Sequence, residues 1–260
     1  MTVNGLLDPE AQAYLAGRLF DENVTVQYRF DTPLRDRVAM LCDLILGKRV
    51  LHIGCCDHVP LLEEKITRGT WLHGRLTEVA AHCVGIDIDD DAVRRTRATS
   101  GLDNIFHGDI TLPEKIPQIA KDVFDYAVFG EVLEHIGNPV QFLNLFLSHY
   151  GSSVKAIIIT VPNALRAGNI KNILRGRETI NSDHRFFFTP YTLAKVAWDA
   201  GLTVVMMQVA LYSRAGRVKQ AILNRFPLFA EDLVYVGTPR QPEPADVFLH
   251  HRSELDARIG

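Results

Sequence analysis

The segment GEVLEHIGNP, residues 130–139, holds three side chains that could do chemistry within five positions. Glu131, Glu134 and His135 have i, i+3, i+4 spacing, which on a helix would place all three on one face. Carboxylates and an imidazole can bind a divalent cation such as Mg²⁺ or Mn²⁺, or can transfer a proton. A local hydrogen-bond network without a chemical role is the alternative interpretation of such a cluster.

Short apolar runs, the first three of which end in glycine or an acid, predict the strands that would position this segment. A periodic stretch over 34–46 that stops at Gly47 predicts a helix before the first run, and helix-like segments separate the runs that follow. This alternation predicts an α/β fold with a mostly parallel sheet covered on both faces. The last two runs lack a parallel crossover of adequate length, so we expect an antiparallel closing pair. The predicted strands cover 49–54, 82–89, 124–130, 156–163, 203–212 and 232–238.

Three residues mark the expected carboxyl ends of strands, where ligands bind in a doubly wound sheet. Gly54 would let a ligand approach the backbone, and Asp87 could accept hydrogen bonds from both hydroxyls of a ribose. Asp109, beside Ile110 in the segment HGDI, could bind an adenine amino group. Taken singly, a glycine here is usually a turn and an aspartate usually a helix cap, so the order and spacing carry the argument.

With these motifs in order, residues 49–237 resemble the class I S-adenosylmethionine-dependent methyltransferases. VLHIGCCDH, VGIDIDDDAV, NIFHGDI and FDYAVFGEVLEHIGNP match the first four motifs of that family. The resemblance implies a Rossmann-like, doubly wound, seven-stranded sheet. His52 stands where the family has an acid that holds the methionine amino group, and Asp57 is the candidate replacement for that carboxylate. The implied cofactor-binding residues are His52, Gly54, Asp57, Asp87, Ile88, Asp109, Ile110 and Glu131.

A second resemblance concerns the opening cluster. EVLEH followed by DHRFFFT is similar to the pattern of the small-RNA 3′-terminal 2′-O-methyltransferases, and its first half also resembles the ubiquinone-pathway O-methyltransferases. The resemblance implies a divalent cation, Mg²⁺ or Mn²⁺, bound by Glu131, Glu134, His135 and His184. Without a metal, His135 or His184 could act directly as a general base and is the candidate catalytic residue.

Composition sets broader limits. The 260 residues carry a net charge of −3, and the four cysteines include no CxxC pair, which argues against a disulfide framework or structural zinc site. We expect a cytoplasmic enzyme without stable membrane insertion, because neither a leader nor an apolar span is recognisable. The predicted divisions are an N-terminal helical extension over 1–48, a methyltransferase domain over 49–238 with an insertion at about 164–188, and a tail or linker over 239–260.

Basic residues concentrate between Ala164 and Arg225, where the sequence has ten lysines and arginines but three acidic residues. A solvated helix surface would explain them, as would a lid that recognises an anionic acceptor. VPN and HRFFFTPYTLAKVAWDAGL resemble the later segments of the methyltransferases that modify small molecules and glycans. That resemblance implies O-methylation of a sugar hydroxyl in a glycan or glycolipid pathway. An RNA 3′ end is the second candidate acceptor, and a non-catalytic binding domain with this fold is a different class of explanation. The ten are Arg166, Lys171, Arg175, Arg177, Arg185, Lys195, Arg214, Arg217, Lys219 and Arg225.

Overall fold

The structure is a computed structural model that describes part of the chain. That part comprises residues 4–5, 9–28, 33–57, 59–114, 116–212 and 216–240.

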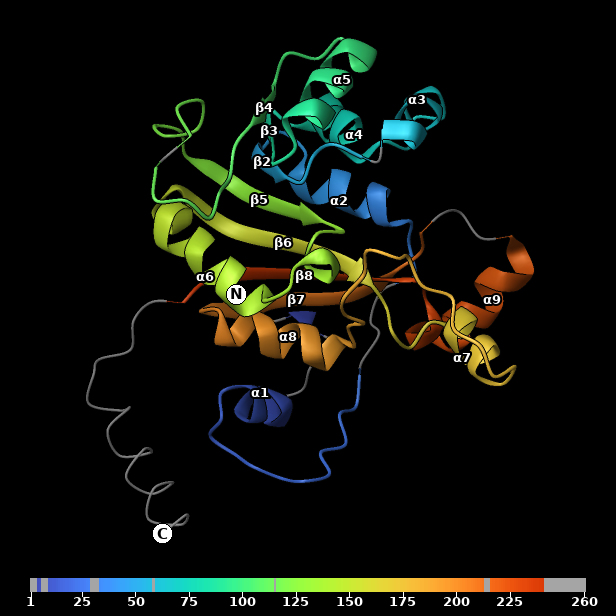
Figure 1. The fold of residues 1–260 in the computed structure, drawn as a ribbon. Helices are drawn as coiled ribbons and strands as arrows, with labels where there is room; N and C mark the ends of the chain where they lie inside the picture. Colours follow the sequence, from blue (N-terminus) through green and yellow to red (C-terminus); the bar gives the residue numbers. More distant parts are fainter. Residues whose placement is uncertain are drawn as a thin grey trace.

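These residues form an eight-stranded sheet with the order β1-β7-β8-β6-β5-β2-β3-β4 (Figure 1). All neighbouring strands are parallel except β8, which is antiparallel to both β6 and β7. The predicted α/β fold with a mostly parallel sheet and an antiparallel closing strand is confirmed. The two-residue β1, from the segment predicted as a helical extension, adds an edge strand to the seven expected. The strands are β1 (Asn4–Gly5), β2 (Arg49–Ile53), β3 (His82–Asp87), β4 (Ile105–His107), β5 (Phe124–Gly130), β6 (Val154–Pro162), β7 (Leu202–Ala210) and β8 (Asp232–Pro239).

Two helical layers cover the sheet, as expected for strands that are apolar on both faces. On one face, α2 and α4 pack through Leu41, Ile45 and Leu76 against Val50 and other strand residues. On the other face, α6 and α8 bury aromatic and aliphatic side chains in the larger core. The helices are α1 (Pro9–Leu15), α2 (Arg37–Ile45), α3 (Val59–Thr67), α4 (Leu72–Val79), α5 (Asp90–Ser100), α6 (Pro139–Tyr150), α7 (Ala167–Ile173), α8 (Pro190–Asp199) and α9 (Arg217–Arg225), with short 3-10 turns at η1 (Leu133–His135), η2 (Gly151–Ser153) and η3 (Pro227–Phe229).

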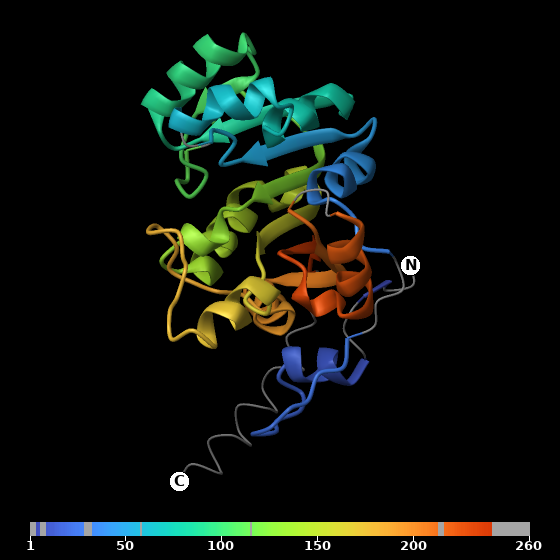
Figure 2. The ribbon, with the colours of Figure 1, turned by 90° about the vertical axis from the view of Figure 1, so that its right-hand side faces the viewer.

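The insertion lies at the end of the sheet toward which β5 and β6 point (Figure 1), on the side of the molecule that faces the viewer in Figure 2. The insertion contains the short helix α7. Residues 173–183 are all exposed to solvent. Of the predicted tail, only residues 239 and 240 are described. None of the helices in the described ranges has the length and apolarity needed to cross a bilayer.

Candidate active site

The carboxyl ends of three neighbouring strands meet at one edge of the sheet. Ile53 of β2 is paired with Ile86 of β3 on one side and with Phe129 of β5 on the other. The next residues along these strands are therefore adjacent: Gly54, Asp87 and Gly130. The sequence predicted this arrangement correctly, because parallel strands necessarily end at the same edge.

Gly54 makes the turn that leaves β2. Its φ is +67°, and its N–H donates to the carbonyl of Ile86 over 2.9 Å. A Cβ at this position would lie 2.7 Å from Cγ2 of Val132. Both the left-handed backbone and the close approach require glycine here. The missing Cβ leaves room for the Val132 side chain to pack against the turn at the end of β2.

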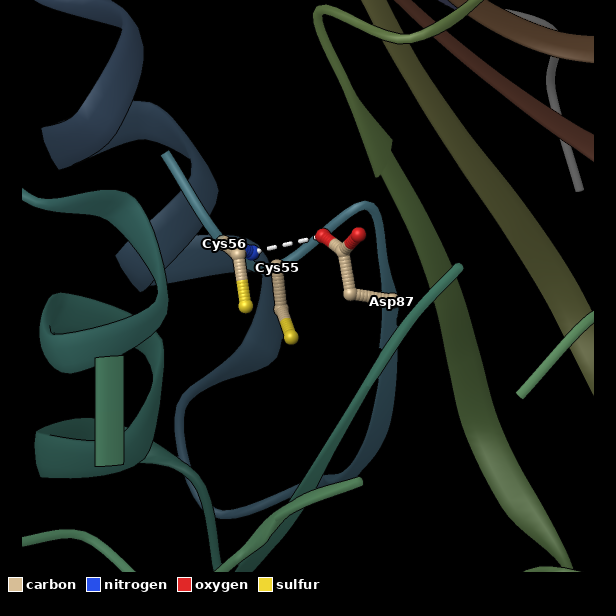
Figure 3. A group of neighbouring side chains, drawn as sticks. All are labelled: Cys55, Cys56 and Asp87. Atoms are coloured by element: carbon tan, nitrogen blue, oxygen red, sulfur yellow. Dashed lines mark hydrogen bonds between the residues drawn. The ribbon is translucent and has the colours of Figure 1, made fainter. Parts of the chain in front are cut away.

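Asp87 ends β3, and its carboxylate is held in place by backbone donors (Figure 3). The N–H of Cys56 donates to Oδ2 over 2.9 Å, and the N–H of Asp89 donates to Oδ1 over 3.1 Å. Burial raises the pKa of this carboxyl, while the two hydrogen bonds oppose the shift. Each oxygen keeps a second lone pair, so the carboxylate can still accept the hydroxyls of a ribose.

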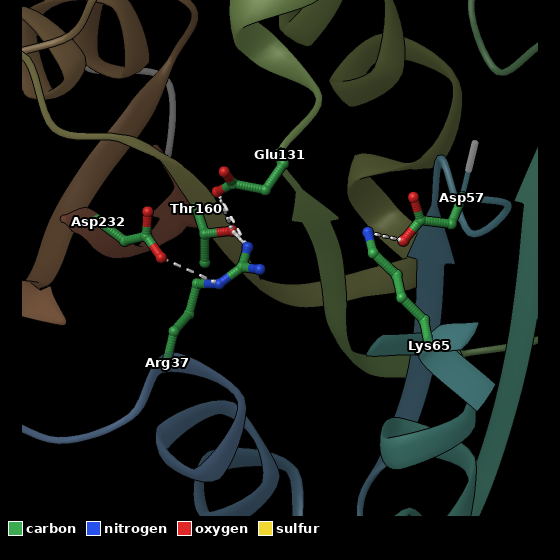
Figure 4. Close-up of polar contacts among 6 residues, drawn as sticks. All are labelled: Arg37, Asp57, Lys65, Glu131, Thr160 and Asp232. Atoms are coloured by element: carbon green, nitrogen blue, oxygen red, sulfur yellow. Dashed lines mark hydrogen bonds and ion pairs between the residues drawn. The ribbon is translucent and has the colours of Figure 1, made fainter. Parts of the chain in front are cut away.

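The other predicted cofactor-binding residues differ in their exposure to solvent and in their polar contacts. Ile88 is 67% exposed next to Asp87 and offers an apolar surface to a nucleobase, whereas Ile110 is buried. Asp109 accepts hydrogen bonds from the Thr111 N–H and hydroxyl, at 2.8 and 2.6 Å. Asp57 forms an ion pair with Lys65 (Figure 4).

His52 lies inside the layer between the sheet and α4. Its ring is only 1% exposed, and its Nδ1 is 3.2 Å from Nδ1 of His73. Burial, followed by the neighbouring His73, lowers the pKa of His52 well below its ordinary value. A neutral imidazole in this layer differs from the charged acid that the family carries at this position. The Asp87 carboxylate, held by two backbone N–H groups, is compatible with S-adenosylmethionine, and the roles of Gly54, Ile88 and His52 stay predictions.

The prediction that residues 131–135 form one helical turn with all three side chains on one face is wrong. Glu131 has a φ of +58° and lies outside the 3-10 turn η1, which begins at Leu133. Its N–H donates to the Thr160 carbonyl over 3.0 Å, which extends the pairing of β5 with β6 by one residue. The chain must then leave the sheet abruptly, and the left-handed residue makes that change of direction.

Three of the four predicted metal ligands nevertheless come together. One ligand atom from each of Glu134, His135 and His184 lies within 4.8 Å of the others. The two imidazole rings have centroids 4.7 Å apart and are almost perpendicular. The Arg185 N–H donates to the Glu134 carbonyl over 2.7 Å, which fixes the insertion against η1 and delivers His184.

Glu134 is the most unusual member of this group. It is fully buried, and neither oxygen of its side chain has a hydrogen-bond partner among the described residues. Burial, and secondarily the charge of Glu131, raise the pKa of the Glu134 carboxyl to about 9. Such a group is costly unless it is protonated or meets a cation. The donor set of one carboxylate and two imidazoles fits a divalent metal ion.

Glu131 contributes to a different set of contacts (Figure 4). Its Oε1 lies 3.0 Å from Nη1 of Arg37 and accepts a hydrogen bond from the Thr160 hydroxyl over 3.0 Å. Nε of Arg37 lies 3.3 Å from Oδ2 of Asp232. Burial raises the pKa of the Asp232 carboxyl to about 8, with Glu131 as the next cause. The predicted fourth metal ligand is thus engaged by a buried arginine.

Sequence reasoning missed Arg37, Thr160 and Asp232. A signal was available for Arg37, because it is on the apolar side of its own helix. It precedes the buried Leu41 by four positions, and an arginine at such a position usually has buried partners.

Comparison with known proteins agrees with this geometry. The model of the family described as "Methyltransferase domain" matches residues 26–206. None of the curated protein sequences compared with the chain matches it significantly.

Two solved structures show the same fold at low identity. A SAM-dependent methyltransferase from Thermotoga maritima has a TM-score of 0.50 and 14% identity, covering 78% of this chain and 87% of its own. The small RNA methyltransferase HEN1 has a TM-score of 0.51 and 17% identity, covering 86% of this chain but 27% of its own. The family model spans most of the chain. The chain therefore belongs to the methyltransferase-domain family and is an S-adenosylmethionine-dependent methyltransferase.

Proposed function

We propose that this enzyme is a cytoplasmic O-methyltransferase that methylates a sugar hydroxyl in a glycan or glycolipid pathway, with the help of a divalent cation. The observation that carries the proposal is Glu134, a buried carboxylate without a partner among the described residues, beside His135 and His184. We assign catalysis to residues 49–238, with 164–188 as a lid, while the N-terminal segment over 1–48 supplies α2 and its Arg37 to the same fold.

The chemistry of methyl transfer explains why such a group would be useful. S-adenosylmethionine supplies an electrophilic methyl group, and an alcohol is a poor nucleophile until its proton is removed. Glu134, His135 and His184 would hold Mg²⁺ or Mn²⁺, an ion able to orient and acidify a bound hydroxyl. Adjacent sugar hydroxyls suit this arrangement, since two oxygens can bind one cation. Without the ion, an imidazole would take the proton itself.

Charge on the insertion supports an anionic acceptor. Lys171, Arg175 and Arg177 are exposed, and Arg185 lines a pocket together with His135 and His184. Phosphate groups on a nucleotide-linked or lipid-linked sugar would meet these cations near the proposed site.

Binding of Mn²⁺, followed by electron paramagnetic resonance, tests the metal directly. We expect one bound ion per chain, lost in E134Q and H184A and retained in the control E178Q, whose parent residue is exposed in the insertion. EDTA should abolish methyl transfer reversibly. Full activity after metal removal, together with loss of activity in H184A, would replace this mechanism with general-base catalysis.

A second acceptor, the 3′ end of an RNA, is favoured by one observation. His184 reaches Glu134 and His135 from the insertion, which is the arrangement implied by the resemblance to the small-RNA enzymes. A terminal ribose also presents two adjacent hydroxyls. Binding of a short RNA should then weaken steeply with salt, because phosphate contacts release counterions. Salt-independent or undetectable RNA binding would leave the glycan acceptor.

A further inference from the structure

Two adjacent cysteines follow Gly54, and both thiols lie beside Asp87 (Figure 3). One ligand atom from each of Cys55, Cys56 and Asp87 lies within 4.8 Å of the others. The sequence alone argued against a zinc site because the cysteines form no CxxC pair. In the fold, Asp87 at the end of β3 supplies a third ligand, which the spacing of the cysteines in the sequence does not show.

The backbone fixes these residues relative to one another. The N–H groups of Gly54 and Cys55 donate to the Ile86 carbonyl, at 2.9 and 3.4 Å. The N–H of Cys56 donates to Asp87 over 2.9 Å, and Nε1 of Trp71 donates to the Cys55 carbonyl over 3.2 Å. Each cysteine is therefore anchored independently of its thiol.

Space for the inner thiol comes from a glycine on the neighbouring strand. Cys55 is 2% exposed, and a Cβ on Gly85 would come within 2.6 Å of its Sγ. Cys56 is only partly buried. The inner thiol is thus enclosed by packing, whereas the residue that carries the outer thiol retains some contact with solvent.

Two thiolates and one carboxylate form a ligand set suited to thiophilic ions of the zinc type. Bonds of about 2.3 Å in tetrahedral geometry place sulfur atoms roughly 3.8 Å apart, and the three ligand atoms already lie within 4.8 Å of one another. Each thiol would release its proton to solvent as a metal–sulfur bond forms, with no change of oxidation state. Water would fill the fourth position.

We propose that Cys55, Cys56 and Asp87 bind a thiophilic divalent cation, Zn²⁺ or Cd²⁺, and that this ion and S-adenosylmethionine exclude each other. The exclusion follows from Asp87, whose carboxylate both ligands require. This site differs from the Glu134, His135 and His184 group in its sulfur donors. The ion would consequently act as an inhibitor that is distinct from the activating Mg²⁺ or Mn²⁺.

Titration of the full chain with Cd²⁺ tests the site, because sulfur bonded to cadmium gives an ultraviolet charge-transfer band that oxygen and nitrogen ligands do not. We expect the band to saturate at one Cd²⁺ per chain. C56S should weaken binding at least about tenfold, since even outer-shell partners contribute 10 to 100-fold to affinity. C42S is the matched control, because Cys42 is in α2, with its Sγ 3.7 Å from the Arg75 carbonyl.

Competition tests the second half of the proposal. S-adenosylhomocysteine should raise the apparent Kd for Cd²⁺ in proportion to its concentration, and D87N should weaken both ligands. E134Q should leave the cadmium band unchanged, so failure of the Mn²⁺ site and failure of this site are distinguishable. If C55S does not fold by circular dichroism, C56S and D87N still decide the outcome. Absence of the band, or equal Cd²⁺ affinity in C56S and C42S, would overturn the site, and simultaneous binding of both ligands would overturn the exclusion.

Discussion

Nη1 of Arg37 lies 3.0 Å from the carboxylate of Glu131, inside a protein region where the arginine side chain is only 9% exposed. The same guanidinium is 3.3 Å from Asp232 through its Nε. The buried guanidinium of Arg37 thus contacts two carboxyl groups, that of Glu131 just after β5 and that of Asp232 at the start of β8. These contacts link the candidate site to the antiparallel strand β8.

Replacement of Arg37 by methionine should destabilise the protein by about 1.5 to 3 kcal/mol, the range for hydrogen bonds that involve a charged group, because Glu131 and Asp232 lose their cationic partner. Urea unfolding at neutral pH measures the loss. R35M is the control, since Arg35 pairs with Asp43 on the exposed surface and such pairs contribute at most about 1 kcal/mol. Equal stability of the two variants would mean that the Arg37 cluster contributes nothing beyond a surface pair.

Gly54→Ala should reduce both stability and cofactor affinity. A left-handed alanine costs about 1 to 2 kcal/mol, and the 2.7 Å approach to Val132 adds an overpacking cost. G69A provides the comparison, because Gly69 has a φ of +63° and a Cβ there would meet nothing within 4 Å. The difference between the two variants isolates the close contact, and V132A should recover part of it. Identical melting temperatures for G54A and G69A would contradict this interpretation.

Asp87→Ala should weaken binding of S-adenosylhomocysteine by about 1.5 to 3 kcal/mol, the range for hydrogen bonds to a charged group. Isothermal titration calorimetry measures the change. Asp103, exposed before β4, supplies the control variant D103A. D57A separately tests whether the Asp57 carboxylate replaces the family acid. Unchanged affinity in D87A would remove Asp87 from the cofactor site.

Acidic pH should destabilise the protein, because burial lowers the pKa values of His52 and His73 in the folded state. Burial lowers the pKa of His73 to about 4, below the ordinary value near 6.5. The unfolded chain therefore binds the proton first, so stability is complete above pH 6.5 and declines as the pH falls. This histidine alone accounts for about 3 kcal/mol by pH 4. Denaturant unfolding between pH 7 and pH 4 should show a shallower decline for H73N than for the parent chain and for H107N, whose parent residue is exposed. Parallel curves for H73N and the parent would refute the assignment.

The exposed stretch over 173–183 should be the first segment cut by protease. If it closes over the acceptor, cofactor product plus acceptor should slow cleavage more than cofactor product alone. Mass spectrometry of the early fragments locates the cut. Equal cleavage rates under both conditions would argue against a lid.

The sheet could be predicted from the sequence because buried parallel strands have a local signature. The runs ending at Gly54, Asp87 and Gly130 are apolar over several consecutive residues, and parallel strands bring their ends together automatically. Glu131 could not be placed in this way. Its left-handed φ depends on β6 lying alongside, and its spacing to Glu134 is equally compatible with a helix. Arg37 raises the same difficulty, since its hydrogen-bond partner Thr160 is 123 residues away in the chain.

The Arg37 cluster also bears on how the chain folds as it is synthesised. Arg37 leaves the ribosome well before Asp232. Asp232 is the first residue of β8, the last strand among the described residues. Domains commonly begin folding from the N-terminus during translation. Here the guanidinium cannot meet its second carboxylate until β8 has emerged, so completion of the site should wait for nearly the whole described chain.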